Sequence, residues 1–427
     1  MTKQPDRTSI GTWLTLALFT ALFALANIDR SLVSILAEPI KREFALSDAQ
    51  LGVLTGLAFA IPYTIAGVPM GMLIDRVNRV RLAHFMASLW AAVTILVGLM
   101  SSYSGMAAIR ALLGAAESSM APTFTSLTSD LFPTARRATA MAILYISSPI
   151  GLLLGFSFGG LIGAHYGWRA SFVVAGVVGI VAAMGLLLVR EPLRGRYDGA
   201  AGAPAGGSPA TMLGLVRLFR QRPALLLLTI AGSSSIAAQS GLSAFAAPFL
   251  IRVLGMTLQN ASLALAMAFG VGGMIGMLGG GLIADRVRAR FPDSVLLFAA
   301  AVATLAAIAA FVAFGVAGPT VALVGLGVYA ILCVAHYGVI FSTFVSLTPP
   351  AMRGSAMAVL LIAQNLVGYG FGPPVMGALS DWFKASGVPQ PLRYAMMAMT
   401  AFYLFAALMF YLANRRVVLD RAVPAAA

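Results

Sequence analysis

One pattern occurs twice in the chain, as Gly71-Met-Leu-Ile-Asp75-Arg76-Val-Asn-Arg79-Val-Arg81 and, 210 positions later, as Gly281-Leu-Ile-Ala-Asp285-Arg286-Val-Arg-Ala-Arg290. Agreement at one long separation indicates an internal duplication. A glycine lets two helices approach closely, and an aspartate can pair with an arginine or face the positive end of a helix. We therefore interpret both copies as charged latches that form in one conformation and break in another. The latch residues are Gly71, Asp75, Arg76, Arg79, Gly281, Asp285 and Arg286. A role for the arginines in membrane topology alone would leave the repeated glycine and Asp-Arg pair unexplained.

The composition of the chain is that of an integral membrane protein. Hydrophobic residues make up 60% of the 427 positions, charged residues only 10%, and the mean hydropathy is +0.92. Soluble proteins carry about 25% charged residues. A bilayer accepts apolar side chains on the outer surface of a helix bundle, so a chain of this length need not divide into soluble domains.

A helix crosses the hydrocarbon in about 20 residues, and apolar stretches between charges and turn residues give twelve candidate spans. Their approximate limits are 12–37, 49–74, 82–101, 105–129, 138–164, 169–189, 223–251, 260–284, 295–316, 320–347, 354–380 and 393–414. The first stretch imitates a cleavable signal peptide, but Asp29 and Arg30 follow inside a still apolar helix. We expect an all-α membrane protein with twelve transmembrane helices in two pseudo-symmetric six-helix bundles around a central cavity.

The distribution of the basic residues decides what the net charge of +14 means. They form short runs between apolar stretches and no long basic tail, which argues against nucleic-acid binding. Assigned to alternate sides of a membrane, twenty lie on the side of the N-terminus and six on the other, among them Lys41, Arg42 and Arg252. Because positive residues favour the cytoplasmic side, we expect both termini in the cytoplasm. The protein is then a multi-pass plasma membrane protein, and its compact loops and few lysines favour a bacterial inner membrane.

The longest polar stretch separates the sixth span from the seventh. Residues 199–210 are rich in Gly, Ala, Pro and Ser, which is typical of a flexible connector. Residues 212–221 then alternate apolar side chains with Arg217 and Arg220, which indicates a short helix along the cytoplasmic interface. A disordered linker is the alternative there. The expected organisation is a bundle over 1–190, a linker over 191–222 and a bundle over 223–427.

Glycines are regularly spaced in the fifth span and clustered in the eleventh. The fifth span carries Gly151, Gly155, Gly159 and Gly163; the eleventh carries Gly368, Gly370, Gly372, Pro373, Pro374 and Gly377. Residues four apart lie on one face of a helix. We expect close helix packing in the fifth span and packing with bending in the eleventh.

Four ionisable residues lie well inside predicted spans: Asp29 and Arg30 in the first, Arg110 and Glu117 in the fourth. A charge at mid-bilayer costs about 2.5–3.5 kcal/mol, so such residues need a partner or a function. We expect all four to meet at one cavity wall. Burial favours the protonated form of a carboxyl group and a nearby guanidinium favours the charged form, so making or losing an arginine contact changes proton binding. A permanent ion-pair network that only fixes helix packing is the alternative.

The second half has no comparable charge inside its spans. Its candidate cavity residues are Gln239, Ser240, His336, Tyr337, Gln364 and Asn365. An imidazole titrates near neutrality, so His336 could join a proton relay, although a lone histidine is more often a hydrogen-bonded structural residue. Arginines on one wall and neutral groups on the other suit an amphiphile with an anionic head, and they also suit a small organic acid.

The repeated loop and the two sets of six spans resemble the major facilitator superfamily. Other stretches are similar to its spinster-like branch: Asn27-Ile28-Asp29-Arg30, Ser47-Asp-Ala-Gln-Leu-Gly52, Asp75-Arg76-Val-Asn-Arg79, Arg110-Ala-Leu-Leu-Gly114 leading to Glu117, and Asp130-Leu-Phe-Pro133. The resemblance implies alternating access by rocking of two halves, with proton coupling and substrate binding at the first-span acid-arginine pair and the fourth-span glutamate. Animal members of this branch carry lysophospholipids or sphingosine phosphate. Ala116-Glu117-Ser118 stands where the branch usually has Gly-Glu-Ala, so the substrate stays open.

From these observations we expect a proton-coupled secondary active transporter. Arg30 and Arg110 would attract an anionic group, while Asp29 and Glu117 exchange protons. The expected substrate is an amphiphilic anion such as a lysophospholipid or sphingolipid-like molecule. The alternatives are a proton-coupled carrier of small organic anions, a multidrug-type exporter, and a sensor or scramblase on the same scaffold.

Motifs of enzymes and of ATP-driven pumps do not occur in the sequence. The chain has no HExxH pair, no Walker A loop and no Gly-x-Ser-x-Gly elbow. Its single cysteine, Cys333, cannot form an internal disulfide or a multi-cysteine metal site. We expect no enzymatic activity, no cofactor, no metal and no nucleic-acid partner. The expected partners are the lipid bilayer, protons and the small-molecule or lipid anion, and the expected state is a monomer.

Overall fold

The computed structural model describes residues 9–197, 212–316, 318–349 and 352–422. Within these ranges every regular element is a helix. Contacts divide the described residues into two compact units, unit 1 from 1–36 and 58–206, and unit 2 from 37–57 and 207–427. Residues 37–57 thus lie inside the predicted first domain in sequence but make their contacts in unit 2. The predicted domain limits themselves stay a prediction, and the predicted connector over 199–210 lies outside the described residues.

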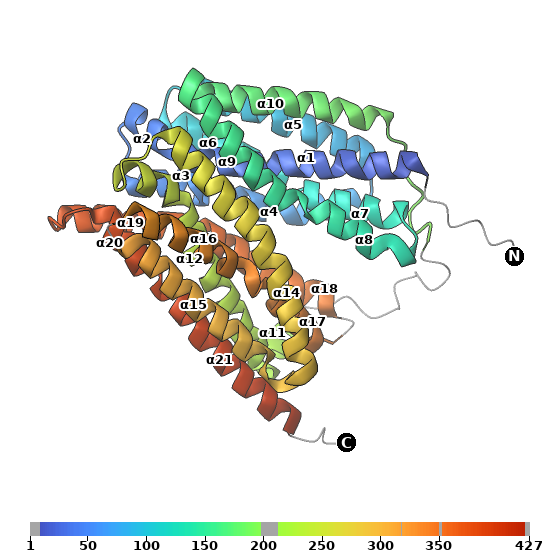
Figure 1. The fold of residues 1–427 in the computed structure, drawn as a ribbon. Coiled ribbons are helices and arrows are strands. Elements are labelled where there is room, and N and C mark those ends of the chain that lie inside the picture. The colour runs from blue at the N-terminus through green and yellow to red at the C-terminus, as the bar shows by residue number, and fades with distance from the viewer. Residues whose placement is uncertain (1–8, 198–211, 317, 350–351, 423–427) are drawn as a thin grey trace, which may run out of the picture. The chain divides into compact units, whose positions relative to one another are not determined.

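Unit 1 is built from helices that lie side by side (Figure 1). They are α1 (Ile10–Ile35), α4 (Leu57–Ile74), α5 (Arg79–Leu99), α6 (Tyr103–Glu117), α7 (Met120–Leu131), α8 (Thr134–Tyr145), α9 (Ser147–Tyr166), α10 (Trp168–Met184) and the short η1 (Gly185–Leu188). Helix α1 packs against α9, and α5 packs against α10. Side-chain caps begin several of them: Ser9 accepts a hydrogen bond from the backbone of Thr12, and Asn78 accepts one from Arg81.

Glycines of α9 bring its backbone against α1. A Cβ at Gly151 would lie 2.5 Å from the carbonyl oxygen of Ala24, and one at Gly155 would lie 1.8 Å from Ser31 Oγ. At Gly159 it would lie 2.3 Å from a methyl carbon of Leu32. The expected close packing of the fifth span therefore exists, since a Cβ at each of these three positions would come closer than 3.0 Å to an atom of α1.

We expect Gly151→Ala to destabilise unit 1, because the new methyl group must push α9 away from the α1 backbone. Overpacking of this kind costs about 1–3 kcal/mol. Gly67→Ala in α4 is the matched control, since a Cβ at Gly67 meets no described atom within 4 Å. Melting temperatures of the two variants in detergent compare them, and equal values would contradict the packing argument.

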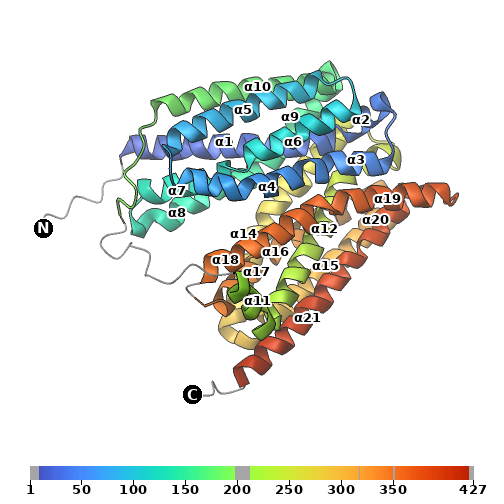
Figure 2. The same ribbon diagram turned by 180° about the vertical axis from the view of Figure 1, so that it is seen from behind.

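Unit 2 contains the remaining helices (Figure 2). They are α2 (Ala37–Phe44), α3 (Asp48–Thr55), α11 (Met212–Gln221), α12 (Pro223–Arg252), α13 (Leu258–Leu265), η3 (Ala266–Gly272), α14 (Gly273–Arg290), η4 (Pro292–Ser294), α15 (Val295–Gly315), α16 (Pro319–Ala335), α17 (Tyr337–Leu347), α18 (Arg353–Ala363), η6 (Gln364–Gly370), α19 (Gly372–Ala385), α20 (Pro391–Met399) and α21 (Ala401–Ala422). Helix α12 lies at the centre, in contact with α21, η6 and α19. Within η3 and η6 the helix is π-helical.

Helix α11 coincides with the predicted short helix over 212–221. Leu215 and Leu218 are buried against unit 2, whereas Val216 and Arg217 are exposed. These residues are therefore helical in the structure. Its position at the cytoplasmic interface stays a prediction.

Eleven helices or joined helices among the described residues are long and apolar enough to cross a membrane. They match eleven of the twelve predicted spans. The fourth predicted span, 105–129, is instead divided into α6 and α7, because the helix is interrupted at Ser118 and Ser119. Many large apolar side chains on the long helices are exposed, such as Ile65 at 70% and Leu278 at 68%, which suits a surface surrounded by lipid tails.

Candidate functional site

Helices α1 and α6 of unit 1 carry the four ionisable residues that lie inside apolar spans. Asp29 and Arg30 lie near the end of α1, Arg110 lies in the middle of α6, and Glu117 is the last residue of α6. Arg110 and Glu117 are seven positions apart, which places them on one face of α6, separated by about 10 Å along the axis. Each can therefore meet a different residue of α1.

The four side chains form two ion pairs. Arg30 Nη2 lies 2.5 Å from Glu117 Oε1, and Arg110 Nη1 lies 3.6 Å from Asp29 Oδ2. Adjacent residues on a helix point about 100° apart, which explains why Asp29 and Arg30 have separate partners. Two acids and two arginines give the cluster a formal charge of zero.

Burial distinguishes Arg30 from the other three residues. The side chains of Asp29, Arg110 and Glu117 are at most 2% exposed, while that of Arg30 is 36% exposed. Removing one partner of a buried pair leaves an uncompensated charge and is strongly destabilising. Arg30 is therefore the one of these four residues with a substantially exposed side chain.

Two aromatic residues of α4 complete the cluster. The guanidinium carbon of Arg30 lies 4.8 Å from the centroid of the Phe59 ring and 5.3 Å from that of Tyr63. Arg110 also lies over Phe59, at 5.4 Å. The two rings stack on each other, 5.5 Å apart with an interplanar angle of 25°. The sequence analysis did not identify these rings, although their spacing of four residues places them on one face of a helix.

The end of α6 at Glu117 is a second feature that the sequence analysis missed. The backbone N–H of Ser118 still donates to the carbonyl of Gly114, at 3.2 Å, and the Ser118 hydroxyl donates to that of Ala115, at 2.8 Å. Helix α7 begins at Met120. Serine hydroxyls that bond to the preceding turn weaken a helix, so the Ser118-Ser119 pair was the available signal. Glu117 thus lies at a break in the fourth span.

The predicted polar residues of unit 2 are only partly brought together. The hydroxyl of Tyr337 donates to Gln239 Oε1, and Gln239 Nε2 lies 3.7 Å from Cys333 Sγ. His336 is fully buried, with Nε2 3.1 Å from Ser235 Oγ. The remaining three face other neighbours: Ser240 Oγ donates to the carbonyl of Gly368, Asn365 Nδ2 donates to that of Leu361, and the buried Gln364 amide lies beside Gly232.

The first repeated loop centres on a buried arginine. Arg79 Nη1 lies 2.5 Å from Asp130 Oδ2, and Arg79 Nε lies 3.0 Å from Glu191 Oε1. Asp75 and Arg76 are exposed, and Arg194 donates to three backbone carbonyls of the loop. Arg79 therefore ties the loop to the ends of two other segments of unit 1.

The second repeated loop has fewer contacts. Asp285 and Arg286 are exposed, and Arg288 Nη2 donates to Ser342 Oγ at 2.6 Å. A Cβ at Gly71 or at Gly281 would meet no described atom of its own unit within 4 Å. The expected close helix approach at these two glycines is therefore not present within either unit.

A second charged cluster links residues 37–57 to the rest of unit 2; we call it the 37–57 network, formed by Glu38, Lys41, Asp48, Arg252, Ser380 and Asp381. Arg252 Nη1 lies 2.8 Å from Asp48 Oδ1, and its Nε pairs with Glu38. Asp48 also pairs with Lys41 and accepts a hydrogen bond of 2.6 Å from Ser380 Oγ. Asp381 accepts from the backbone N–H groups of Asp48 and Ala49, at 3.1 and 2.8 Å, and so caps α3.

Glycines bring α3 and α19 together beside this network. A Cβ at Gly52 would lie 2.3 Å from the carbonyl oxygen of Pro373, and one at Gly377 would lie 2.1 Å from that of Asp48. The predicted packing role of the glycines in the eleventh span is met here. Helix α3 is thus held to α19 by backbone contact as well as by charge.

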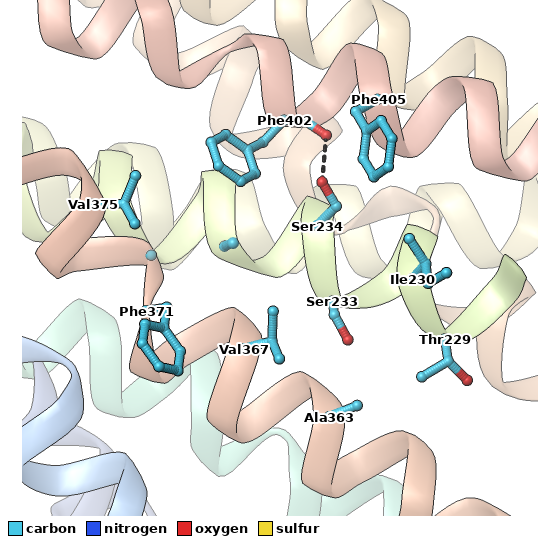
Figure 3. A pocket seen from close by; sticks show the side chains of 12 residues that line it. Thr229, Ile230, Ser233, Ser234, Ala363, Val367, Phe371, Val375, Phe402 and Phe405 are labelled. Carbon is cyan, nitrogen blue, oxygen red and sulfur yellow. Dashed lines mark hydrogen bonds between the residues drawn. The ribbon is translucent and has the colours of Figure 1, made fainter. Parts of the chain in front are cut away.

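Unit 2 also contains an apolar cavity of about 290 Å³ among α12, η6, α19 and α21 (Figure 3). Phe371, Phe402 and Phe405 contribute its aromatic lining, and Thr229, Ser233 and Ser234 its hydroxyl groups. Ser234 donates to the carbonyl of Phe402 at 2.8 Å. None of the predicted polar residues lines this cavity. Its chemistry suits an apolar chain better than a charged group.

Comparison with known proteins agrees with this architecture. A family model described as Major Facilitator Superfamily matches residues 17–368. The sequence is 29% identical to an MFS-type efflux pump of Mycolicibacterium smegmatis, over 95% of this chain and 93% of the pump. It is 26% identical to Protein spinster of Drosophila melanogaster, over 86% of this chain and 62% of that protein. It is 25% identical to a hexuronate transporter of Bacillus subtilis, over 86% and 88%.

The structural comparison gives the same picture. The crystal structure of a bacterial homolog of the human lysosomal transporter Spinster, in an inward-facing and unoccupied conformation, matches with a TM-score of 0.85. The match covers 98% of this chain and 100% of that chain, at 26% sequence identity.

Proposed function

The chain belongs to the Major Facilitator Superfamily and is a membrane transporter similar to the spinster proteins, and from that premise we propose that it is a proton-coupled secondary transporter of an amphiphilic anion. The observation that carries the proposal is the contact between Arg30 and Glu117. It joins a partly exposed cation to a carboxylate that is 2% exposed. One arginine can therefore serve either the buried carboxylate or an incoming anion.

The coupling step follows from this competition. An anion that binds Arg30 weakens the Arg30–Glu117 pair, because the guanidinium then shares its charge between two acceptors. A buried carboxylate without a full counter-charge is costly, and binding a proton at one of its oxygens removes that cost. Anion binding and proton uptake at Glu117 are then favourable together. Asp29 and Arg110 form a second pair of a carboxylate with an arginine, and both of its side chains are buried.

Alternating access requires the two units to move relative to each other. Residues 37–57 are anchored in unit 2, whereas the chain on either side of them belongs to unit 1. Movement must therefore bend the chain at the junctions near Leu36 and Gly56, or release the 37–57 network. The predicted topology places Lys41 and Arg252 on the non-cytoplasmic side, so we infer that the network holds residues 37–57 in place on that side.

The substrate class is supported by the contrast between the two units. Unit 1 offers two arginines, while unit 2 offers the neutral Gln239–Tyr337 pair and an apolar cavity. The arginines of unit 1 suit an anionic group, and the apolar cavity of unit 2 suits an apolar chain. The similarity to a hexuronate transporter favours a small carboxylate as the second candidate, and the similarity to an efflux pump favours a multidrug substrate as the third.

We expect proteoliposomes of this protein to accumulate a fluorescent lysophosphatidate when a pH gradient is imposed, and to stop when a protonophore removes the gradient. Galacturonate and ethidium, tested in the same vesicles, represent the two alternatives. Accumulation of galacturonate alone would replace the lipid substrate by a small acid, and pH-driven movement of ethidium alone would indicate a multidrug exporter. Equilibration of lysophosphatidate without any response to the gradient would contradict proton coupling.

A further inference from the structure

The ring of Phe59 is shared by both arginines of the charged cluster. The guanidinium carbons of Arg30 and Arg110 lie 4.8 and 5.4 Å from its centroid. Each arginine also has its own carboxylate, Glu117 or Asp29. Both ion pairs therefore contact the Phe59 ring, each through its arginine.

An aromatic ring holds a cation in a different way from a carboxylate. The ring attracts the guanidinium through the negative potential of its face, and the interaction gains strength away from water. It binds no proton, so the attraction stays the same when a neighbouring carboxyl group is protonated. The edge of a stacked guanidinium keeps its N–H groups available for oxygen acceptors.

The backbone fixes this ring relative to both arginines. A Cβ at Gly114 would lie 2.4 Å from the carbonyl oxygen of Phe59, so α6 and α4 touch at this point. Gly114 lies four residues after Arg110 and three before Glu117, on the same face of α6. Phe59 is itself only 8% exposed. The backbone that carries the ring is therefore held against α6, and the ring itself is buried.

We propose that Phe59 is a positioning residue of the transport site, whose ring keeps Arg30 and Arg110 in place while Glu117 or Asp29 is protonated. This proposal rests on the proposed function. Without the ring, each arginine would lose a contact whose strength does not change when its carboxylate is protonated. With the ring, the anion site stays assembled through the proton-bound part of the cycle.

Tyr63 has a smaller share in this role. Its ring lies 5.3 Å from the guanidinium carbon of Arg30 and stacks on Phe59. Phe59, by contrast, lies beside the guanidinium groups of both arginines. Loss of the Tyr63 ring should therefore affect one arginine, and loss of the Phe59 ring should affect two.

The test replaces Phe59 by phenylalanines that carry one, two and three fluorine atoms on the ring. Fluorine withdraws electron density from the face of the ring and leaves its shape nearly unchanged, so it weakens a cation contact stepwise. The full-length protein in detergent is titrated with fluorescent lysophosphatidate, and its melting temperature is measured in parallel. The same series at Phe124 is the matched control, because Phe124 is fully buried in unit 1 and stacks on Phe19 at 5.0 Å.

We expect the dissociation constant for lysophosphatidate to rise stepwise, by about tenfold over the series, because each added fluorine weakens the contact of both guanidinium groups with the ring. Phe59→Leu should weaken binding at least as much, Phe59→Trp should restore it, and Tyr63→Leu should have a smaller effect. The melting temperature and the Phe124 series should change little. A flat response at Phe59, or an equal response at Phe124, would overturn the proposal.

Failure of this proposal is distinguishable from failure of the proposed function. The binding titration needs no pH gradient, whereas the proposed function is judged by proton-driven accumulation in vesicles. One outcome is that the native protein accumulates lysophosphatidate in vesicles while fluorination of Phe59 leaves the dissociation constant unchanged. That outcome would keep the transport function and would show that Phe59 has no part in it. Stepwise loss of affinity without any proton-driven accumulation keeps Phe59 as a positioning residue of an anion site and removes the coupling.

Discussion

Glu117→Gln should reduce proton-driven accumulation of substrate to about its equilibrium level while leaving substrate exchange across the membrane in place. Glutamine has the size and hydrogen-bonding oxygen of a protonated glutamate, but it cannot take up or release a proton. Arg30, which pairs with Glu117 at 2.5 Å, then has less competition for the anion. Each unit of pH gradient can support about tenfold accumulation per coupled proton, and the variant should lose this factor.

The measurement compares net uptake under an imposed pH gradient with exchange of labelled for unlabelled substrate at equal pH. Exchange needs no net proton movement, so it shows that the variant is folded and still binds substrate. Asp293→Asn, which neutralises an exposed carboxylate in η4, serves as the control and should behave as the native protein does. Continued accumulation by Glu117→Gln against its gradient would remove Glu117 from the coupling step.

Hydropathy and charge were sufficient to predict most of the fold, because they depend on local sequence. Eleven of the predicted apolar stretches are helices long enough to cross a membrane, and the regularly spaced glycines of α9 lie in close contact with α1. The interruption between α6 and α7 was not predicted, because an average over about 20 residues hides two serines. The membership of residues 37–57 in unit 2 was also not predicted. It depends on contacts with Arg252, Ser380 and Asp381, which lie more than 200 positions away.

The charged cluster was predicted as a set, and the structure adds its internal order. Charges inside apolar spans stand out because each must be compensated, so Asp29, Arg30, Arg110 and Glu117 could be chosen from sequence. Their pairing required the actual faces of α1 and α6. Phe59 could not be chosen, because a phenylalanine in a transmembrane helix is ordinary, and only the two guanidinium groups over its ring distinguish it.

Arg252→Gln should release residues 37–57 from unit 2. Arg252 pairs with Glu38 and Asp48, whose side chains are 8% and 7% exposed. Removing one partner from a buried charged pair costs about 3–5 kcal/mol. Lys41 still pairs with Asp48, but Glu38 keeps only Arg42 among the ion pairs of the described residues. We expect at least about a tenfold shift towards states in which α3 has left α19, since 1.4 kcal/mol already corresponds to that factor.

A cysteine at position 51 reports this release. Leu51 is fully buried, at 0% exposure, so Leu51→Cys in a Cys333→Ser background should react slowly with a maleimide. Adding Arg252→Gln should raise the labelling rate of this cysteine by about tenfold or more. It should also slow transport, because the state in which α3 packs against α19 is then less populated. Arg393→Gln is the matched control, since Arg393 donates to the carbonyl of Gly315 and has no carboxylate partner among the ion pairs described for unit 2. If labelling at position 51 does not change with Arg252→Gln, the network does not hold α3 in place. Backbone contact at Gly52 and Gly377 is then sufficient to keep α3 against α19.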